Sequence, residues 1–530
     1  MTKTHDSSRR RFLGGASAGA VAGMVASVPL RAAAPPANWD KETDVVVVGG
    51  GGSGCMAAVS ANEQGAKAII VEAAPVIGGA SVMCIGAVTV PLSSLQKKEG
   101  IADSVDAYME DVLKLAGENV SRMDKSLLRV LGENGGPTID WLLGLGVDLR
   151  GPFEYPVHRV KRMHMLYPRS SAWPRVIRPR LAKGGTETLV STKGVELYRG
   201  EANRVLGVRV VAIKSGKSIS IKARRGVVLT AGNFEANPTM MAKVTTADIA
   251  ALPVAVPTND GGGLIMAAAL GAGMTMLDNG AIPYVRGRLP GPPVDPTAKM
   301  QWMPFGFVEA GAILVNQNGA RFINEEMHGT PTCLALESQP EKTCHLVYDK
   351  RIADNFQKWP NIAALIPGIG DISRLGGWGT VDDLIARKAV YKADTIEQLA
   401  AVVGVDPAGL KAGIEKWNGY CSAGNDPEFH RQTFGHPGAG TVGKGISAPP
   451  FYCHSPLRTM VLPGDTSVEI NTSLQVLDVF GKVIPSLYAG GVMGHGNLLL
   501  RGIGYGIHMA WAFTSGRLSG RNAAAEKPWG

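Results

Sequence analysis

Residues 44–54 read DVVVVGGGGSG, and this stretch decides the fold of the chain. Its four valines predict a buried β-strand, and the glycines that follow predict a tight turn into a helix. A second strand, AIIV at 68–71, comes after the helix and ends at the acidic residue Glu72. A strand, a glycine turn, a helix and a second strand within about thirty residues form the first unit of an α/β domain with a parallel sheet.

The glycine spacing fits the GxGxxG turn that binds dinucleotides. Gly49 permits the tight turn, Gly51 lets a pyrophosphate approach the backbone, and Gly54 lets the helix pack against the strand. The phosphates then lie at the positive end of the helix dipole. Glu72 follows Gly54 by eighteen residues, where a carboxylate can accept the hydroxyls of an adenosine ribose. The alternative is an ordinary glycine-rich turn, since glycine supplies 68 of the 530 residues.

The rest of the chain continues this alternation of helices and strands. The segments that carry it are helical residues 103–146, short strands within 193–232, a helix opened by NDGGG at 259–263, a hairpin at 476–485, a strand at 487–490 and a final helix to about 525. Residues 285–300 are rich in proline and glycine and indicate an excursion from the sheet. The sequence therefore predicts one sheet that is completed by strands from both ends of the chain.

The N-terminus has the pattern of a twin-arginine export signal. Residues 8–13 read SRRRFL, and a weakly apolar run follows at 14–30. AAA at 32–34 offers a cleavage site, but Pro35 is a poor first residue of a mature chain, so an uncleaved anchor stays an alternative. We expect residues 1–34 to engage the twin-arginine translocase and to bring a folded, cofactor-loaded protein to the periplasm. No later segment approaches twenty apolar residues, so we expect the mature body to be soluble.

Length, charge and cysteine content exclude several classes of protein. About 495 residues after the signal suit two or three domains with substantial cores. Residues 1–34 carry five cations and one acid, which leaves a net charge of +5 from the total of +9 for the remaining chain. This mild excess, without any nucleic-acid motif, argues against nucleic acid as a partner. The six cysteines have no CxxC, haem-attachment or iron–sulfur spacing, and we expect no metal site.

One segment departs from this charge balance. Between residues 155 and 186 there is no acid, whereas eight lysine or arginine side chains occur. Such a run is typical of a solvated surface. Alternatively, its field attracts an anionic substrate or a redox partner.

These landmarks together resemble the flavoprotein subunits of the fumarate reductase/succinate dehydrogenase superfamily, which includes soluble fumarate reductases, urocanate reductases and ketosteroid dehydrogenases. The likeness runs from about residue 42 to 525, and NGARFINE at 318–325 looks like the GxRFxNE hairpin of that family. The resemblance implies an α/β fold in which a discontinuous, Rossmann-like FAD-binding domain carries an inserted α+β capping domain. The implied divisions are a signal peptide at 1–34, the FAD-binding domain at 41–280 and 455–525, and the capping domain at 281–454.

The cofactor that the resemblance implies is FAD. Covalent attachment in this family needs a histidine beside the second glycine pair, and this chain has Gly79-Ala80-Ser81 there, so we expect FAD to be held non-covalently. Gly491 replaces a glutamate that is common in relatives, and one flavin contact is expected to come from elsewhere. The expected cofactor-binding residues are Gly49, Gly51, Gly52, Ser53, Gly54, Glu72, Gly78, Gly79, Ala80, Ser81, Gly232, Asp260 and Gly490.

The resemblance also gives candidate catalytic residues. Arg501 falls on the arginine that serves substrate binding and proton chemistry in fumarate reductases, and its planar fork suits a carboxylate or carbonyl. The alternative is that Arg501 pairs with a buried acid. Gly329 and Pro463 fall on two other determinants of fumarate reductases, a proton-donating arginine and a substrate histidine, which puts a dicarboxylate substrate in doubt. The candidates to handle the proton instead are Tyr284, His328, Tyr505 and His508.

We therefore expect an exported FAD oxidoreductase that desaturates or reduces a carbon–carbon bond adjacent to a carbonyl or carboxylate of a small molecule, by hydride transfer with flavin N5. Because the chain has no haem or iron–sulfur ligands, its electrons pass through a separate carrier, a c-type cytochrome or a quinone-linked protein. One alternative is a ketosteroid-type or cyclic-ketone dehydrogenase, which needs tyrosines near the carbonyl. The other is a flavin-carrying electron-transfer subunit without a substrate of its own.

Overall fold

The computed structural model describes most of the chain after the predicted signal. It describes residues 33–529, except 85, 155–157, 169, 245–249, 251–253, 255, 276–280, 289–299, 303–306, 309, 327–331, 333, 334, 337, 355–380, 438, 439, 465 and 500–505. All of the predicted export signal except Ala33 and Ala34 therefore lies outside the described residues. Within them, no helix has the length and apolar character needed to cross a bilayer.

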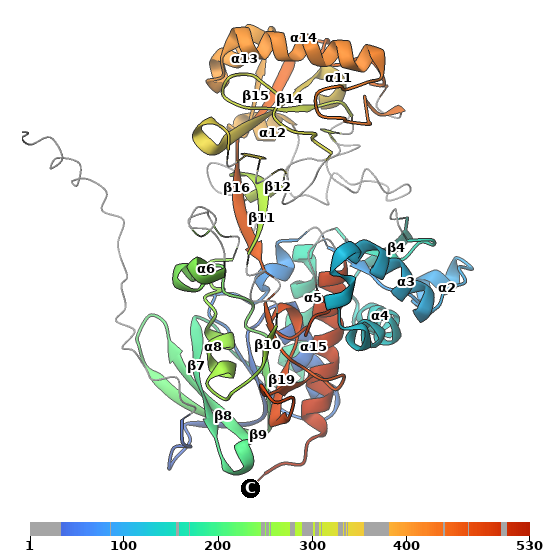
Figure 1. Ribbon diagram of the computed structural model, residues 1–530. Helices are drawn as coiled ribbons and strands as arrows, with labels where there is room; N and C mark the ends of the chain where they lie inside the picture. The colour runs from blue at the N-terminus through green and yellow to red at the C-terminus, as the bar shows by residue number, and fades with distance from the viewer. Residues whose placement is uncertain are drawn as a thin grey trace, which may run out of the picture.

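The lower body of the molecule is built on an eight-stranded mixed sheet (Figure 1). Its main path runs β18-β19-β9-β1-β2-β6, and β7 and β8 extend it as an antiparallel flap beside β9. The strands are β1 (Lys41–Val48), β2 (Ala68–Val71), β6 (Glu187–Leu189), β7 (Thr192–Arg199), β8 (Val205–Ala212), β9 (Ser218–Leu229), β18 (Gln475–Leu477) and β19 (Val483–Ala489). Strand β1 is central, with Val46 opposite Ile69 of β2 and Val227 of β9. The valine run is therefore buried because β1 has a parallel neighbour on each side.

Two helices from opposite ends of the chain pack together beside this sheet. They are α1 (Gly52–Glu63), which follows the glycine turn, and α15 (Ile507–Ala525). A methyl group on Gly516 of α15 would lie 2.2 Å from the carbonyl oxygen of Ser53, so the two backbones meet because glycine is present. The predicted hairpin at 476–485 and the predicted final helix are thus confirmed as β18–β19 and α15.

A mainly helical layer covers the other side of α15, on the right of Figure 1. It contains α2 (Ser94–Lys98), α3 (Val105–Ala116), α4 (Lys125–Leu145) and α5 (Trp173–Lys183), with a small sheet of β3 (Ala87–Thr89), β5 (Met163–Leu166) and β4 (Leu149–Phe153). The long helical segment predicted at 103–146 is divided between α3 and α4. Helix α4 begins where the Asp124 carboxylate accepts the N–H groups of Ser126 and Leu127, and it ends at the left-handed Gly146.

The upper part of the molecule is a second domain, the cap (Figure 1). Its six-stranded sheet runs β12-β11-β16-β14-β13, and β15 also pairs with β16. The strands are β11 (Ala281–Arg288), β12 (Met300–Trp302), β13 (Ile313–Val315), β14 (Thr343–Asp349), β15 (Val390–Ala393) and β16 (Phe451–Pro463). The cap helices are α11 (Lys350–Ala353), α12 (Val381–Ala386), α13 (Ile396–Val403) and α14 (Pro407–Ala423).

The chain enters and leaves the cap through neighbouring antiparallel strands. Ala281 of β11 pairs with Pro463 of β16, and the ladder continues upward to Gly287 opposite Leu457. Below it, β10 (Met274–Thr275) pairs with β17 (Ser467–Val468). Strand β16 thus continues the cap sheet beyond residue 454, where the sequence placed the end of the cap. The predicted fold class, an α/β domain of discontinuous sequence with an inserted α+β domain, is confirmed.

Candidate functional site

The glycine turn between β1 and α1 has the form of an open anion site. Because a methyl group at Gly54 would lie 1.8 Å from the carbonyl oxygen of Gly49, only glycine lets helix α1 begin so close to the strand. A methyl group at Gly51, by contrast, would meet no atom within 4 Å. The first turn of α1 contains no acid and no side-chain cap. Its N–H groups and the positive end of its dipole therefore face a space that a phosphate can fill.

Glu72, directly after β2, turns its carboxylate back toward this turn. It is 6% exposed, and it accepts the N–H of Gly50 at 2.6 Å and the N–H of Ala74 at 2.7 Å. Burial raises the pKa of Glu72, and these two hydrogen bonds oppose that rise. Each carboxylate oxygen has a second lone pair that these bonds leave free. Glu72 therefore both holds the turn in shape and offers acceptors to a ribose.

A second wall is formed by residues 78–82, which lie against the glycine turn. The N–H of Gly78 donates to the carbonyl oxygen of Gly50 at 2.9 Å, and the N–H of Gly52 donates to the hydroxyl of Ser81 at 3.2 Å. The hydroxyl of Ser53 is buried and has no hydrogen-bond partner in the described part of the chain. A buried hydroxyl without a partner is costly, so this atom is suited to contact a bound ligand.

The opposite wall comes from the ends of β7 and β9 and the start of α8 (Gly262–Ala268). The Asp260 carboxylate accepts the N–H of Gly262 at 3.0 Å and forms an ion pair with the Lys193 ammonium. Asn259 lies so close to Gly232 that a methyl group there would be 2.3 Å from its side-chain oxygen. These contacts bring residues from three separate stretches of sequence to one pocket.

Ten of the thirteen predicted cofactor residues line this pocket, namely Gly49, Gly51, Gly52, Ser53, Glu72, Gly79, Ala80, Ser81, Gly232 and Asp260. The other three lie behind its wall. Gly54 packs α1 on β1, Gly78 pairs with Gly51, and Gly490 donates its N–H to the carbonyl oxygen of Leu229 at 3.1 Å.

Sequence reasoning missed a further part of the lining. It comprises Val48, Val71, Ala73, Thr192, Lys193, Gly194, Thr230, Ala231, Met266, Val492 and Ala512, among others. The β7 residues carry no motif, since they reach the pocket only because the β7–β8 flap folds beside β2. Gly491, noted from the sequence for lacking the usual glutamate, also lines the pocket, and its N–H donates to the Ser515 hydroxyl at 2.8 Å.

One buried acid lies directly behind this wall. Glu235 is 2% exposed, and one of its oxygens accepts a hydrogen bond from the Asn259 amide at 2.7 Å. The other oxygen has no partner among the described residues. Burial raises the pKa of Glu235 to about 8, against the smaller opposing effect of its hydrogen bonds. This carboxyl group is therefore largely protonated at neutral pH.

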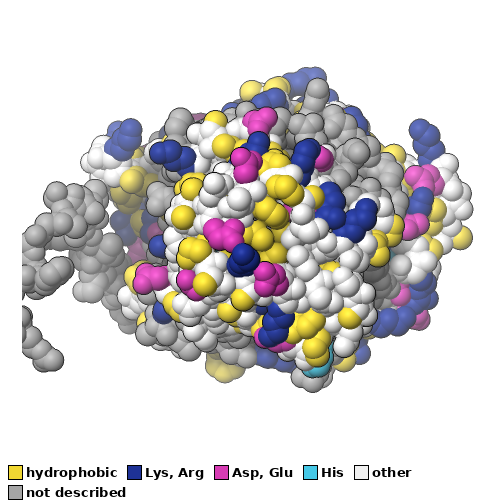
Figure 2. All heavy atoms as spheres, turned by 90° about the horizontal axis from the view of Figure 1, so that it is seen from above, with side chains coloured by type: hydrophobic (Ala, Val, Ile, Leu, Met, Phe, Trp, Pro, Cys, Tyr) yellow, Lys and Arg dark blue, Asp and Glu magenta, His cyan; other side chains and the backbone are white. Residues whose placement is uncertain are grey.

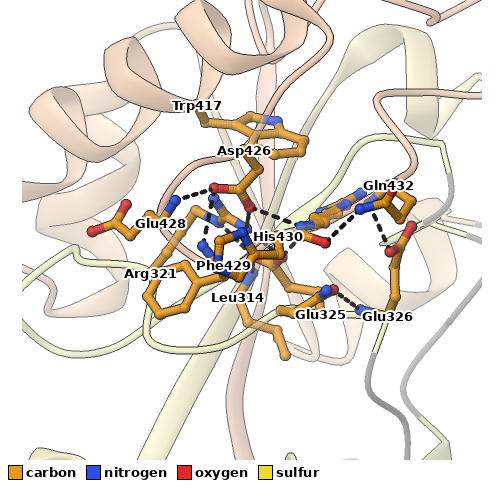
Figure 3. Close-up of polar contacts among 12 residues, drawn as sticks. Leu314, Arg321, Glu325, Glu326, Trp417, Asp426, Glu428, Phe429, His430 and Gln432 are labelled. Atoms are coloured by element: carbon orange, nitrogen blue, oxygen red, sulfur yellow. Dashed lines mark hydrogen bonds and ion pairs between the residues drawn. The ribbon is translucent and has the colours of Figure 1, made fainter.

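The NGARFINE motif lies in the cap, where it forms a buried group of charges (Figure 3). We call Arg321, Glu325, Asp426 and Arg431 the cap charge cluster; all four side chains are at most 3% exposed. Arg321 binds both oxygens of Glu325, at 2.8 and 2.7 Å, and Asp426 at 2.9 Å. The ring of Trp417 lies 4.6 Å from the guanidinium of Arg321 and 4.4 Å from that of Arg431. Two cations and two anions balance each other here, so the motif builds a cap core.

The cluster continues into the backbone that follows the motif. The Glu326 carboxylate accepts the N–H groups of Gln432 at 2.9 Å and Thr433 at 2.7 Å, which fixes residues 426–433 on the hairpin (Figure 3). The candidate His328 comes two residues later and lies outside the described residues, as do Arg501 and Tyr505. Tyr284 is placed in β11 opposite Met460 of β16, and its side chain is not described. The four catalytic assignments stay predictions.

The residues of the pocket fit FAD. The space beside Gly51 and the uncapped start of α1 suit a pyrophosphate, and Glu72 suits an adenosine ribose. The buried Ser53 hydroxyl has no partner among the described residues and can hydrogen-bond the cofactor. Residues 79–81 contain no histidine that could form a covalent bond to the flavin.

Comparison with known proteins agrees with this geometry. A family model described as "FAD binding domain" matches residues 44–504. The chain is 28% identical to a urocanate reductase of Eggerthella lenta, over 92% of this chain and 76% of the relative. It is 26% identical to a 3-oxosteroid 1-dehydrogenase of Mycolicibacterium smegmatis, over 86% of this chain and 93% of the relative.

A solved structure also resembles the whole arrangement of sheet and cap. It is the open conformation of a flavocytochrome c3 fumarate reductase, which superposes with a TM-score of 0.75 at 26% identity. The match covers 92% of this chain and 79% of the other. Since the match covers so much of this chain, the likeness extends beyond the nucleotide-binding turn.

Proposed function

Because the chain belongs to the FAD binding domain family, we propose that it adds or removes hydrogen across a carbon–carbon bond next to a carbonyl or carboxylate. It is an FAD-dependent dehydrogenase or reductase that acts on CH–CH bonds. The observation that supports the finer proposal is the chemical similarity of the compounds after which the relatives are named. Fumarate and urocanate hold a double bond conjugated to a carboxylate, and a 3-oxosteroid holds a ring ketone. In each compound the oxygen group withdraws electrons. It makes the β-carbon of a conjugated double bond able to accept hydride, and it makes the neighbouring C–H of the saturated form acidic.

The division of labour in this proposal follows from the chemistry of the side chains. The residues of the pocket would hold FAD, which would supply hydride exchange with one carbon of the substrate. Arg501 binds the substrate oxygen and stabilises the negative charge that develops on it, because its guanidinium stays charged and presents a planar pair of donors. Tyr505, Tyr284 and His328 are the candidates to move the proton at the neighbouring carbon. The pocket residues around Glu72 and Ser53 hold the cofactor and take no part in proton transfer.

The experiment that tests this proposal is a substrate screen read by flavin absorbance. Purified protein, reduced with dithionite, is mixed with unsaturated carboxylates and enones, and oxidised protein is mixed with saturated acids and ketones including 3-oxosteroids. We expect one compound class to change the absorbance within the time of a turnover. No response to any member of either set would contradict the proposal, and a response to 3-oxosteroids alone would favour the ketosteroid-type alternative.

Fumarate is the informative member of that screen. Gly329 has no side chain to deliver a proton, and Pro463 has no polar side chain to bind a carboxylate. We therefore expect fumarate to be reduced slowly. A rate on fumarate close to that of the best substrate would show that these two positions were assigned wrongly.

We also propose that the enzyme works in the periplasm after twin-arginine export. Changing Arg9 and Arg10 together to lysine should leave folded, FAD-containing protein in the cytoplasm, as measured by fractionation and flavin fluorescence. The control changes Lys97 and Lys98 to arginine, which alters two basic residues outside the predicted signal. Continued export of the first variant would contradict the twin-arginine assignment.

A further inference from the structure

The basic segment at 155–186 separates into two parts in the structure. In the first part the cations are neutralised: Arg162 is fully buried between Asp103 and Asp111, with N–O distances of 2.6 Å to each. Arg159 binds Asp111 and Glu110, and Lys161 lies 3.3 Å from Glu99. In the second part, helix α5 carries Arg175, Arg178, Arg180 and Lys183, all exposed. None of these four has a carboxylate partner among the described residues.

Helix α5 places these cations on its outer face. Its inner face buries Trp173, Ile177 and Leu181, spaced four residues apart, against α1 and α4. The ring of Trp173 packs edge-on against Phe513 of α15 at 6.0 Å, and its Nε1 lies 3.5 Å from the carbonyl oxygen of Ser81. Ser81 is part of the wall of the FAD pocket. The cationic face is therefore separated from that wall by about one helix diameter, some 10 Å.

This surface differs from the outer face of the cap. Seen from above, the cap shows positive and negative side chains in close alternation (Figure 2), and its lysines pair across α13 and α14, as Lys411 does with Glu397 at 2.9 Å. On α5 the charge has one sign only. The field of Arg178 reaches inward as far as Cys55 in α1, where it opposes the larger effect of burial, which raises the pKa of the thiol. A one-signed field of this kind steers oppositely charged molecules to the surface.

We propose that the exposed cationic face of α5 is the docking surface for the external electron carrier, and that this carrier is a small acidic redox protein. The inference deepens the proposed function, because it needs an enzyme that exchanges electrons with a separate carrier. In the reducing direction, two one-electron carriers are oxidised, and two protons come from water. Hydride then goes to one substrate carbon and a proton to its neighbour, which balances the two electrons. In the oxidising direction the carriers receive the two electrons and both protons return to water.

The chemistry of the surface favours a protein over other anions. A small substrate would have to reach the interior, whereas these four side chains lie on the outside of α5. A membrane surface is bound most firmly where apolar side chains accompany the cations. Of the large apolar side chains exposed in the described part of the chain, none lies on α5. Paired charges of opposite sign across a polar surface are typical of transient protein encounters.

The test measures electron exchange in the holoenzyme by stopped-flow absorbance. Reduced flavodoxin is the acidic probe, and a basic mitochondrial cytochrome c is the opposite probe. The double variant Arg175→Glu/Lys183→Glu is compared with Lys214→Glu/Lys217→Glu, an equal change of charge on exposed residues of the β8–β9 turn. In Figure 1 the labelled strands β7 and β8 lie to the left of α5. FAD content and melting temperature are recorded for both variants to confirm folding.

We expect the α5 variant to lower the rate constant with flavodoxin about tenfold or more at low salt, and to raise it with the basic cytochrome. The rate of the unmodified protein with flavodoxin should fall as salt rises. Equal effects of the two double variants, or a rate independent of salt, would overturn the proposal. Loss of binding to phosphatidylserine vesicles with unchanged flavodoxin kinetics would overturn it as well, in favour of a membrane surface. Dithionite-driven turnover of substrate needs no carrier, so its failure would count against the proposed function alone.

Discussion

The nucleotide turn and the cap charge cluster place polar groups in the interior in opposite ways. The turn, residues 44–54 with Glu72, is built from neighbours in sequence and leaves the buried Ser53 hydroxyl without a partner among the described residues. The cluster joins Arg321 to Asp426, 105 residues away, and its charges cancel one another. The unused hydroxyl of the turn lies at a pocket, whereas the cluster uses most of its donors on its own acids and leaves only Nη1 of Arg321 without a partner among the described residues. The place of the unused groups, at a pocket or inside a neutral cluster, therefore distinguishes the two regions.

The largest expected effect tests the structural side of this comparison. Changing Arg321 to Ala removes three hydrogen bonds and leaves Glu325 and Asp426 buried without their main counterion. We expect the free energy of unfolding to fall by about 3–5 kcal/mol, as measured by denaturant titration with tryptophan fluorescence. The control Lys416→Ala breaks the exposed pair with Glu428 and should cost no more than about 1 kcal/mol. Equal losses in the two variants would mean that the cluster does not stabilise the cap.

The next effect separates chemistry from cofactor binding. If Arg501 stabilises charge on the substrate oxygen, Arg501→Ala should lower turnover about 100-fold, on the order of 2.7 kcal/mol. Arg501→Lys should recover only part of this rate, because an ammonium lacks the planar fork. FAD content, melting temperature and single-turnover flavin reduction are measured on each variant. A loss of FAD and of stability would show instead that Arg501 pairs with a buried acid and has a structural role.

A smaller effect concerns Glu235, a buried acid whose environment resembles neither region. Its pKa is raised from 4.5 to about 8, so between these values the native protein holds a proton that the unfolded chain releases. The free energy of unfolding must therefore fall as pH rises, by about 2–3 kcal/mol between pH 6 and pH 9. Glu235→Gln should lack this part of the pH dependence, whereas the exposed Glu341→Gln should keep it. Identical pH profiles of the unmodified protein and Glu235→Gln would show that the carboxyl group stays ionised.

The smallest effect tests the ligand-binding side. Glu72→Ala removes the acceptors offered to the ribose, and we expect FAD binding to weaken by about 1–3 kcal/mol, the usual range for a hydrogen bond to a charged group. Apoprotein is titrated with FAD while flavin fluorescence is followed. Because Glu72 also accepts the N–H of Gly50, the melting temperature of the apoprotein is measured to separate a change in the turn from a lost ribose contact. Unchanged affinity would contradict the assigned role.

The fold and part of the candidate site could be predicted because their signals are local. The valine run, the GxGxxG spacing and Glu72 lie within thirty residues, and each has a direct physical reason for its position. Lys193 and Met266 could not be found in the same way, because no motif marks them and they reach the pocket only through the path of the β7–β8 flap and of α8. The NGARFINE motif identified the family correctly, although its arginine serves the cap core.

The eight cations at 155–186 show most clearly what each level of description decides. The sequence alone established an excess of positive charge there and predicted the nucleotide turn from its glycine spacing, while its resemblance to a flavoprotein superfamily implied the cofactor. Only the tertiary structure decided that Arg162 is buried between Asp103 and Asp111, while Arg175 and Lys183 face outward from α5. The reason is that the charge of a side chain is fixed by its chemistry, whereas its counterions come from wherever the fold brings other segments. The sequence therefore determined which ligand the turn can hold, and packing decided which charges remain free to meet a partner.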